Sequence, residues 1–152
     1  MTTKSIPSSR RRGAGFTLIE TVIATSIAGV LASIAYPSVA GALQKVRRSE
    51  ALVAMMQLQQ AEERWRSASA RYATLAELGL PAVATGGHYQ LTVGDATGSG
   101  YVAVAQAIGA QSGDRQCRYL KLTLDAGNPS YRSGETEAAD NGTAANRQCW
   151  NL

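Results

Sequence analysis

Few side chains in this sequence could take part in covalent or metal chemistry. His88 is the only histidine, and Cys117 and Cys149 are the only cysteines. They cannot supply a zinc site built from several histidines or from four cysteines. No serine stands in a nucleophile-elbow motif, and no dense cluster of Asp and Asn indicates calcium. The sequence therefore predicts no catalytic constellation, no metal site and no cofactor.

Glu20 is the one carboxylate whose position in the sequence suggests an ion pair. It stands directly before a run from Thr21 to Gln44 that contains no charged residue. A carboxylate at the edge of such a run is costly in a membrane and needs a partner, and the nearest would be a free amine. A cut between Gly15 and Phe16 would create that amine four positions before Glu20.

The 24 uncharged residues after Glu20 are enough to cross a bilayer as a helix, which needs about 20 residues. Lys4 and the three arginines at 10–12 precede this run, and no acidic residue stands before Glu20. The positive-inside rule therefore predicts a cytoplasmic N-terminus with the rest of the chain outside. An uncleaved signal anchor would share these features, whereas an ordinary secretory signal would need a small-x-small cleavage site after the run.

The residues around this cut match a known export signal. Residues 15–20, Gly-Phe-Thr-Leu-Ile-Glu, follow a short basic leader and resemble the type III signal of type IV prepilins. The resemblance covers residues 13–45. It implies that a prepilin peptidase cuts after Gly15 and methylates the amine of Phe16. It also implies that Glu20 pairs with the Phe16 amine of a neighbouring subunit during assembly.

The same resemblance implies how the hydrophobic segment is used. The helix is retained, first as a single-pass anchor in the inner membrane and then in the core of a filament that runs from the periplasm to the cell surface. Gly29 and Pro37 fall where pilins usually carry them, and the proline permits a kink. The implied partners are other pilin subunits, the prepilin peptidase, the inner-membrane pilus assembly platform and, before assembly, the membrane.

The helix is expected to continue beyond the hydrophobic run. Residues 45–71 contain neither Gly nor Pro and are rich in good helix formers, so one helix is predicted from about 16 to 70. Apolar residues at spacings of three and four predict a stripe that packs on a globular head. The predicted stripe consists of Leu52, Met55, Met56, Leu58, Ala61 and Trp65. A short helix near Thr74, ended by Gly79, is expected in the segment that follows.

The remainder of the chain reads as a small β head. Alternating apolar residues predict strands near 89–93, 101–107 and 119–124, with Gly-rich turns that favour an antiparallel meander. The predicted fold class is α+β: a pilin fold with a long N-terminal helix packed on a small antiparallel sheet. The expected parts are a cleaved leader (1–15), a hydrophobic transmembrane and assembly helix (16–43), an amphipathic half-helix (44–71) and the head (72–152).

Cys117 and Cys149 are expected to form a disulfide, because an exported chain meets an oxidising compartment. The bridge would close a polar C-terminal region and contribute roughly 3–4 kcal/mol in the loop-entropy model; two free buried thiols are the alternative. The region resembles the D-region of a pilin. The last residues, 149–152, are similar to those of PilE and ComP-like minor pilins.

These features predict a structural subunit that works by assembly and not an enzyme: a PilE-type minor pilin supporting pilus biogenesis, adhesion or twitching motility. A type II secretion pseudopilin and a ComP-like DNA-uptake receptor are the alternatives. DNA contact would need several basic residues on one face. The candidates are Arg115, Arg118, Lys121, Arg132 and Arg147. Residues 55–152 hold eight basic and nine acidic side chains, so ordinary solvated charges remain the other interpretation.

Overall fold

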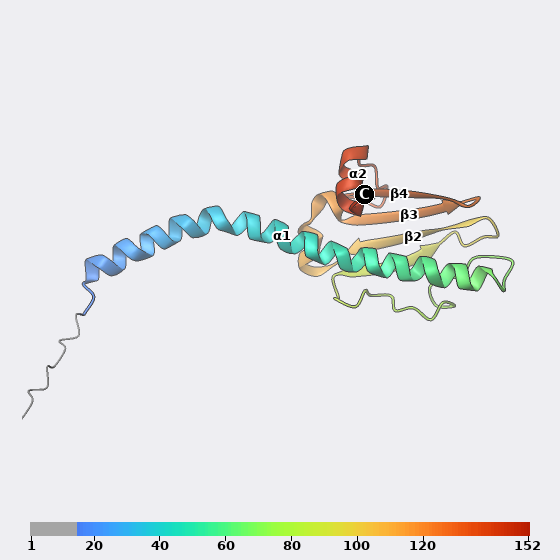
Figure 1. Cartoon of the computed structure of the whole chain (residues 1–152), viewed down its shortest axis with the longest axis horizontal. Helices are drawn as coiled ribbons and strands as arrows, with labels where there is room; N and C mark the ends of the chain where they lie inside the picture. The colour runs from blue at the N-terminus through green and yellow to red at the C-terminus, as the bar shows by residue number, and fades with distance from the viewer. Residues whose placement is uncertain (1–14) are drawn as a thin grey trace, which may run out of the picture. The chain divides into compact units, whose positions relative to one another are not determined.

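The computed structural model describes residues 15–152, without the side chain of Pro37, and divides the chain into two compact units, 1–39 and 40–152. The predicted leader up to residue 14 lies outside the described residues. One helix, α1 (Leu18–Arg66), belongs to both units (Figure 1). It starts and ends within a few residues of the predicted limits, and its helical backbone continues through Gly29 and Pro37.

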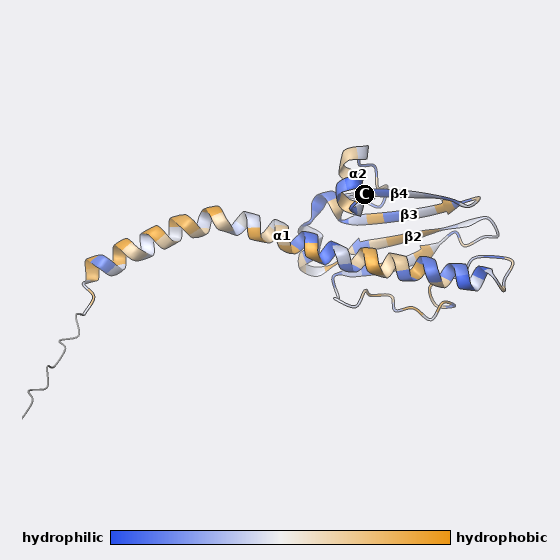
Figure 2. Ribbon diagram, viewed as in Figure 1, coloured by the Kyte–Doolittle hydropathy of each residue, from blue (hydrophilic) through white to orange (hydrophobic). Residues whose placement is uncertain are grey.

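The first unit presents its apolar side chains to the surroundings. Its helix is long and apolar enough to cross a membrane, and every side chain described between residues 15 and 39 is exposed. Figure 2 shows mostly orange, hydrophobic residues along this part of α1, with paler ones between them. A helix that is apolar on every side is stable only in lipid or among other apolar helices.

The second unit contains one antiparallel sheet with strand order β1-β2-β3-β4. The strands are β1 (Tyr89–Gly94), β2 (Gly100–Ala107), β3 (Tyr119–Asp125) and β4 (Asn128–Gly134). The pilin-like α+β class and the three predicted strands are confirmed, whereas β4 was missed.

β4 escaped prediction because its sequence, Asn-Pro-Ser-Tyr-Arg-Ser-Gly, is poor in typical strand residues. The strand forms because Ala126 and Gly127 take positive φ angles of 47° and 82°, which fold the chain back tightly after β3. Pro129 is tolerated because β4 is an edge strand.

The core lies between the sheet and the second half of α1. Met55 and Leu58 of the helix and Leu120 and Leu122 of β3 are at most 1% exposed and belong to one cluster. The predicted stripe was displaced in part, since Met56 is 56% exposed. Met55, Leu58 and Ala61 of the predicted stripe are buried, and small alanines at 51 and 54 let the helix approach the sheet closely.

The segment between α1 and β1 contains less regular structure than predicted. The expected helix near Thr74 is a single turn, in which the Leu78 amide donates to the Thr74 carbonyl over 3.1 Å. Gly79, with a φ of 66°, ends that turn as predicted.

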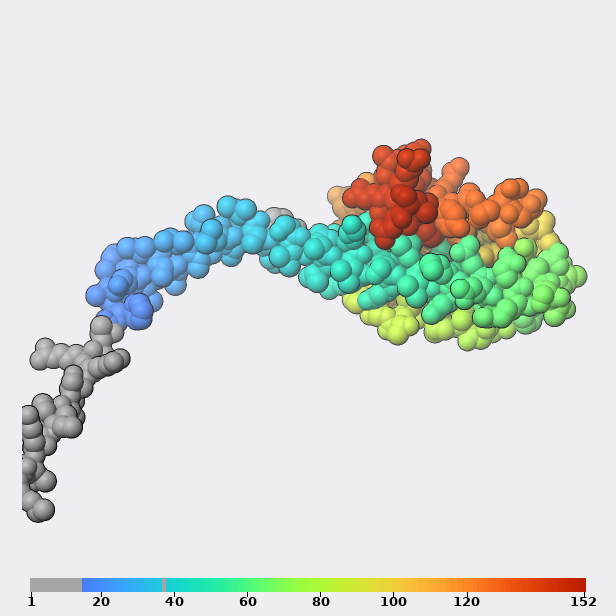
Figure 3. All heavy atoms as spheres, in the orientation of Figure 1, coloured from blue at the N-terminus to red at the C-terminus, as the bar shows by residue number. Residues whose placement is uncertain are grey.

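After β2 come two 3₁₀ turns, Gly109–Gly113 and Arg115–Cys117, and after β4 comes α2 (Thr143–Trp150). α2 was not predicted, because only its last two residues, Cys149 and Trp150, are buried. Figure 3 shows α2, in red, lying against the head portion of α1.

Glu62 is a fully buried carboxylate in α1 that the sequence pattern did not reveal. Its Oε2 accepts a hydrogen bond from the Ala73 amide over 2.9 Å, while its buried Oε1 has no partner within the described residues. Burial raises the pKa of the Glu62 carboxyl above its ordinary value of 4.5, and the Ala73 amide opposes that rise. A raised pKa in the folded state means that ionisation of Glu62 opposes folding.

Glu62→Gln is therefore expected to gain stability relative to the wild type as pH rises. The wild-type contribution is present below the unfolded-state pKa and is lost as pH rises through the folded-state pKa. Urea unfolding of both proteins between about pH 4 and pH 7 measures the difference. Glu63→Gln, which changes an exposed neighbour that only adds a weaker charge repulsion to Glu62, should show a much smaller trend. A stability difference between Glu62→Gln and wild type that stays constant with pH would contradict this account.

Candidate assembly and nucleic-acid interfaces

Glu20 closes the start of α1 through a capping box with Thr17. Oε2 of Glu20 accepts hydrogen bonds from the Thr17 amide and hydroxyl, each over 3.0 Å, and the Thr17 hydroxyl oxygen accepts from the Glu20 amide over 3.3 Å. These bonds satisfy donors that a helix start otherwise leaves without partners, which matters in lipid. The Thr-x-x-Glu spacing is visible in the sequence, so this role was predictable and was missed.

The cap occupies only one of the two carboxylate oxygens of Glu20. Within residues 15–152, Oε1 of Glu20 makes no intrachain hydrogen bond. The side chain is exposed, as are those of Phe16 and Leu18 beside it. One oxygen of Glu20 is therefore available to a cation from outside the chain while the other continues to cap the helix.

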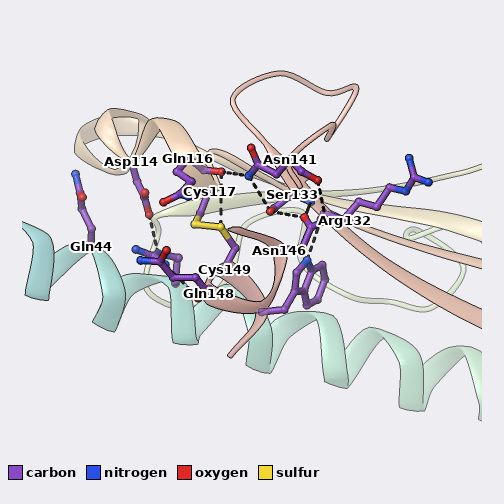
Figure 4. The surroundings of a disulfide bond; sticks show 12 residues. Gln44, Asp114, Gln116, Cys117, Arg132, Ser133, Asn141, Asn146, Gln148 and Cys149 are labelled. Atoms are coloured by element: carbon purple, nitrogen blue, oxygen red, sulfur yellow. Dashed lines mark hydrogen bonds and ion pairs between the residues drawn. A yellow bond between two sulfur atoms is a disulfide. The ribbon is translucent and has the colours of Figure 1, made fainter. Parts of the chain in front are cut away.

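The Cys117–Cys149 disulfide is present, with the two Cα atoms 5.6 Å apart and both side chains fully buried (Figure 4). It joins the 3₁₀ turn before β3 to the end of α2. The region it closes is more ordered than its polar composition suggested, because it holds β3, β4 and α2.

Side-chain hydrogen bonds fasten α2 to β4 beside the disulfide. Oδ1 of Asn146 accepts from the amide and hydroxyl of Ser133, each over 2.7 Å, and the Trp150 indole donates to the Arg132 carbonyl over 2.9 Å. The Trp150 ring also packs edge-on to Tyr131, with 5.0 Å between centroids. α2 therefore fixes the backbone of β4 at Arg132.

Asn141 begins the tripeptide Asn-Gly-Thr, which matches a glycosylation sequon, and its side chain belongs to this hydrogen-bond network. The Asn141 side-chain amide donates to the Gln116 carbonyl over 2.7 Å and to the Ser133 hydroxyl over 3.0 Å. Both of its hydrogens are thus used within the fold (Figure 4). The folded head does not offer this nitrogen for glycosylation.

A buried polar cluster holds the disulfide region to α1. Arg48 Nε lies 2.7 Å from Asp114 Oδ2, and both side chains are about one-tenth exposed or less. The Gln111 amide nitrogen lies within hydrogen-bond distance, 3.1–3.2 Å, of the Gln44 carbonyl, the Tyr89 hydroxyl and Asp114. Burial raises the Tyr89 pKa to about 12, so the hydroxyl stays protonated. Nothing in the local sequence around Arg48 or Asp114 indicated that these charges would meet.

His88 stands directly before β1 and is half-buried. Its Nδ1 lies 3.0 Å from Oε2 of Glu50 on α1, and the imidazole is 30% exposed. A Cβ added to Gly86 would stand less than 3 Å from the Glu50 carboxylate, so a larger residue there would displace the Glu50 side chain. Within the described chain, no three His, Cys, Asp or Glu residues gather as metal ligands do.

The five basic residues considered for DNA contact separate into different places. Arg115 Nε lies 2.7 Å from Oε1 of Glu135, and Arg118 lies 3.9 Å from the same oxygen. Arg147 is exposed on α2. Lys121 and Arg132 lie directly opposite each other on β3 and β4. Only this last pair shares one face at cross-strand distance.

The face that carries this pair is called here the outer sheet face. Side chains along a strand alternate between faces, so burial of Leu120 and Leu122 places Lys121 on the side away from the core. The outer sheet face comprises Gln90, Thr92, Val102, Val104, Gln106, Tyr119, Lys121, Thr123, Ser130 and Arg132. Asp125, at the far end of β3, lies on the same side, about 13 Å from Lys121 at 3.3 Å per residue, so no acidic residue of these strands stands next to the pair.

An apolar N-terminal helix, a four-stranded antiparallel sheet and a C-terminal disulfide together define a pilin-like α+β protein. Residues 10–36 match the prokaryotic N-terminal methylation motif. Residues 37–121, more than half of the chain, match the family described as type IV minor pilin ComP, DNA uptake sequence receptor. The chain belongs to this family of type IV minor pilins.

The family assignment confirms a pilin subunit, and it favours the pilus over the type II secretion alternative. The family is one of structural pilins and not of enzymes. Its methylation motif and apolar helix fit a membrane-anchored pilin that is assembled into a pilus. The chain has no match among curated proteins.

Proposed function

We propose that this minor pilin binds double-stranded DNA through the outer sheet face of its head. The description of its family, a DNA uptake sequence receptor, supports this role, and the matched residues include Lys121. The observation that carries the proposal is the direct pairing of Lys121 with Arg132 across two strands. Of the five basic residues considered from the sequence, only these two are proposed to contact DNA.

The pairing of Lys121 with Arg132 does not help the chain to fold. Like charges directly opposite in adjacent strands destabilise a sheet, by a few tenths of a kcal/mol up to about 1 kcal/mol. No carboxylate on the outer sheet face lies next to either side chain, so the protein itself does not compensate the two charges. Phosphate groups would compensate them, and arginine and lysine are the usual contacts to the DNA backbone.

The surroundings of the pair suit a nucleic acid. Gln90, Gln106 and Thr123 offer donors and acceptors on the same face, and Tyr119 adds a half-exposed ring. Attachment of the Arg132 carbonyl to Trp150 holds β4 in a fixed register beside β3. A rigid sheet presents the two cations at a constant spacing, which reduces the entropy lost on binding.

Lys121→Gln with Arg132→Gln is expected to weaken DNA binding about tenfold or more and to reduce the salt dependence by a slope of nearly 2, because each phosphate contact adds about 0.9. Fluorescence anisotropy of labelled duplex DNA with full-length protein in detergent measures both effects. The double variant should be no less stable in urea than the wild type, since it removes a repulsion. The matched control, Lys45→Gln with Arg147→Gln, removes the same charge elsewhere. Equal losses in both variants would contradict a site on the outer sheet face.

We also propose that the chain is made as a precursor with residues 1–15 as leader, cut before Phe16 and methylated there. Residues 16–43 then anchor it in the inner membrane with a cytoplasmic N-terminus, 44–71 comprise the second half of α1 and the turn that ends it after Arg66, and 72–152 form the rest of the head. The family's methylation motif supports this processing. The proposed partners are neighbouring pilins, prepilin peptidase and the inner-membrane assembly platform.

Mature protein from sheared filaments is expected to begin at methylated Phe16. N-terminal sequencing and intact-mass analysis measure this directly. Replacing Gly15 by a bulky residue should leave full-length precursor in the membrane, whereas Gly29→Ala, outside the signal, should be processed normally because its Cβ meets open space. A filament subunit that begins at Met1, or beyond residue 40, would contradict the processing scheme.

A further inference from the structure

Positively charged residues follow the hydrophobic segment at its outer end, where the positive-inside rule disfavours them. Lys45, Arg47 and Arg48 follow the uncharged run within four residues. The structure accounts for one of them, because Arg48 is buried and paired with Asp114. Lys45 is exposed and Arg47 is half-buried, and neither has an ion-pair partner within residues 15–152.

α2 brings a third basic side chain to the same level of α1. A guanidinium nitrogen of Arg48 lies 3.5 Å from the Gln148 carbonyl, and Figure 4 shows Gln148 lying over α1 beside Asp114. Arg147 precedes Gln148, is exposed, and has no ion-pair partner in the described part of the chain. Lys45, Arg47 and Arg147 are called here the basic collar.

Chain connectivity fixes the depth of the basic collar. The uncharged run of 24 residues spans about 36 Å as a helix, at 1.5 Å per residue. The hydrocarbon layer is about 30 Å thick, and each headgroup layer adds roughly 5–7 Å. Lys45 is the residue directly after the run, so its ammonium reaches the headgroup layer when the run spans the membrane. Long basic side chains extend readily toward lipid phosphates.

We propose that the basic collar binds anionic lipid headgroups on the outer face of the membrane that holds the helix. This inference rests on the proposed anchoring of residues 16–43. The same charges would suit DNA phosphates, but the chain tethers Lys45 and Arg47 at a surface where lipid phosphates are already present at high density. The head is thereby held against the membrane by contacts that must break when the subunit leaves the bilayer for the filament.

The division of basic residues follows from this proposal. Lys121 and Arg132 on the outer sheet face serve DNA, whereas the basic collar serves the membrane. Arg115 and Arg118 are paired with Glu135 and belong to neither surface. If the two positively charged surfaces have different tasks, substitutions in one should abolish its binding without affecting binding by the other.

Native mass spectrometry of the full-length protein, released from nanodiscs of phosphatidylcholine and phosphatidylglycerol with the same acyl chains, tests the inference. A basic residue near an anionic surface is worth roughly a fivefold gain in lipid affinity, so the wild type should retain phosphatidylglycerol preferentially. Lys45→Gln, Arg47→Gln and Arg147→Gln together should remove most of that preference. The matched control, Lys121→Gln with Arg132→Gln, should retain it and lose DNA binding instead.

The remaining outcomes overturn the inference in distinguishable ways. If the triple variant keeps the wild-type lipid preference, or if the wild type has none, the basic collar does not bind lipid. If the triple variant loses DNA affinity, the basic collar belongs to the DNA surface. Resistance to alkaline extraction from pure phosphatidylcholine vesicles reports helix insertion separately. A chain that is extracted there fails the proposed anchoring, and the lipid inference falls with it.

Discussion

Glu20→Gln is expected to insert into the membrane normally and to fall out of the filament fraction by tenfold or more. A glutamine at this position still accepts the Thr17 amide and hydroxyl, so the capping box at the start of α1 survives. The variant loses only the negative charge. In the proposed assembly that charge meets the Phe16 amine of a neighbouring subunit, and an ammonium left buried without a partner strongly disfavours packing.

The measurement compares membrane and sheared-filament fractions for the variant, the wild type and Thr17→Ala. Thr17→Ala removes the capping hydroxyl but keeps the charge of Glu20, so it should still assemble. If both variants fail alike, Glu20 acts through the helix cap and not through charge pairing. If Glu20→Gln enters filaments at the wild-type level, the pairing with Phe16 is wrong. Normal extraction resistance in every variant shows that insertion was not the step affected.

The sequence predicted those parts of the fold that periodic patterns or local motifs determine. The uncharged run, the alternating strands and the turn ended by Gly79 each depend on neighbours along the chain. β4 and α2 were missed because their residues have weak local preferences. Their structure comes from pairing with β3 and from the anchors Cys149 and Trp150.

The candidate site likewise contains features that the sequence predicted and features that only the structure reveals. The cysteine pairing could be inferred because only two cysteines exist in an exported chain. The contact between Arg48 and Asp114 could not, because the two charges are 66 positions apart and meet only through tertiary packing. The basic residues near the C-terminus formed a single set in the sequence. Strand register then placed Lys121 beside Arg132, while Glu135 took up Arg115 and Arg118.

Removing the disulfide is expected to destabilise the sheet as well as the polar C-terminal region. Cys117→Ala with Cys149→Ala should lower the free energy of unfolding by about 2–5 kcal/mol, the usual range for a native bridge in a small exported domain. The helix α1 and the strands β1 and β2 lie outside the closed loop. In the structure the loop contains β3, which pairs with β2 and supplies Leu120 and Leu122 to the core. Loosening the loop therefore weakens the centre of the sheet and not only a surface tail.

Urea unfolding followed by tryptophan fluorescence measures the effect, since Trp150 reports on α2 directly and Trp65 on α1. Alanine is preferred to serine at both positions because the cysteines are fully buried and a serine hydroxyl there would add its own cost. Asn146→Ala is the matched control: it breaks two hydrogen bonds between α2 and β4 and leaves the bridge intact. If the bridge holds α2 as proposed, Trp150 fluorescence in the double alanine variant should change at lower urea concentration than that of the Asn146→Ala variant. A double alanine variant as stable as the wild type, or free thiols titrating in the native protein, would show that hydrogen bonds alone order the C-terminal region.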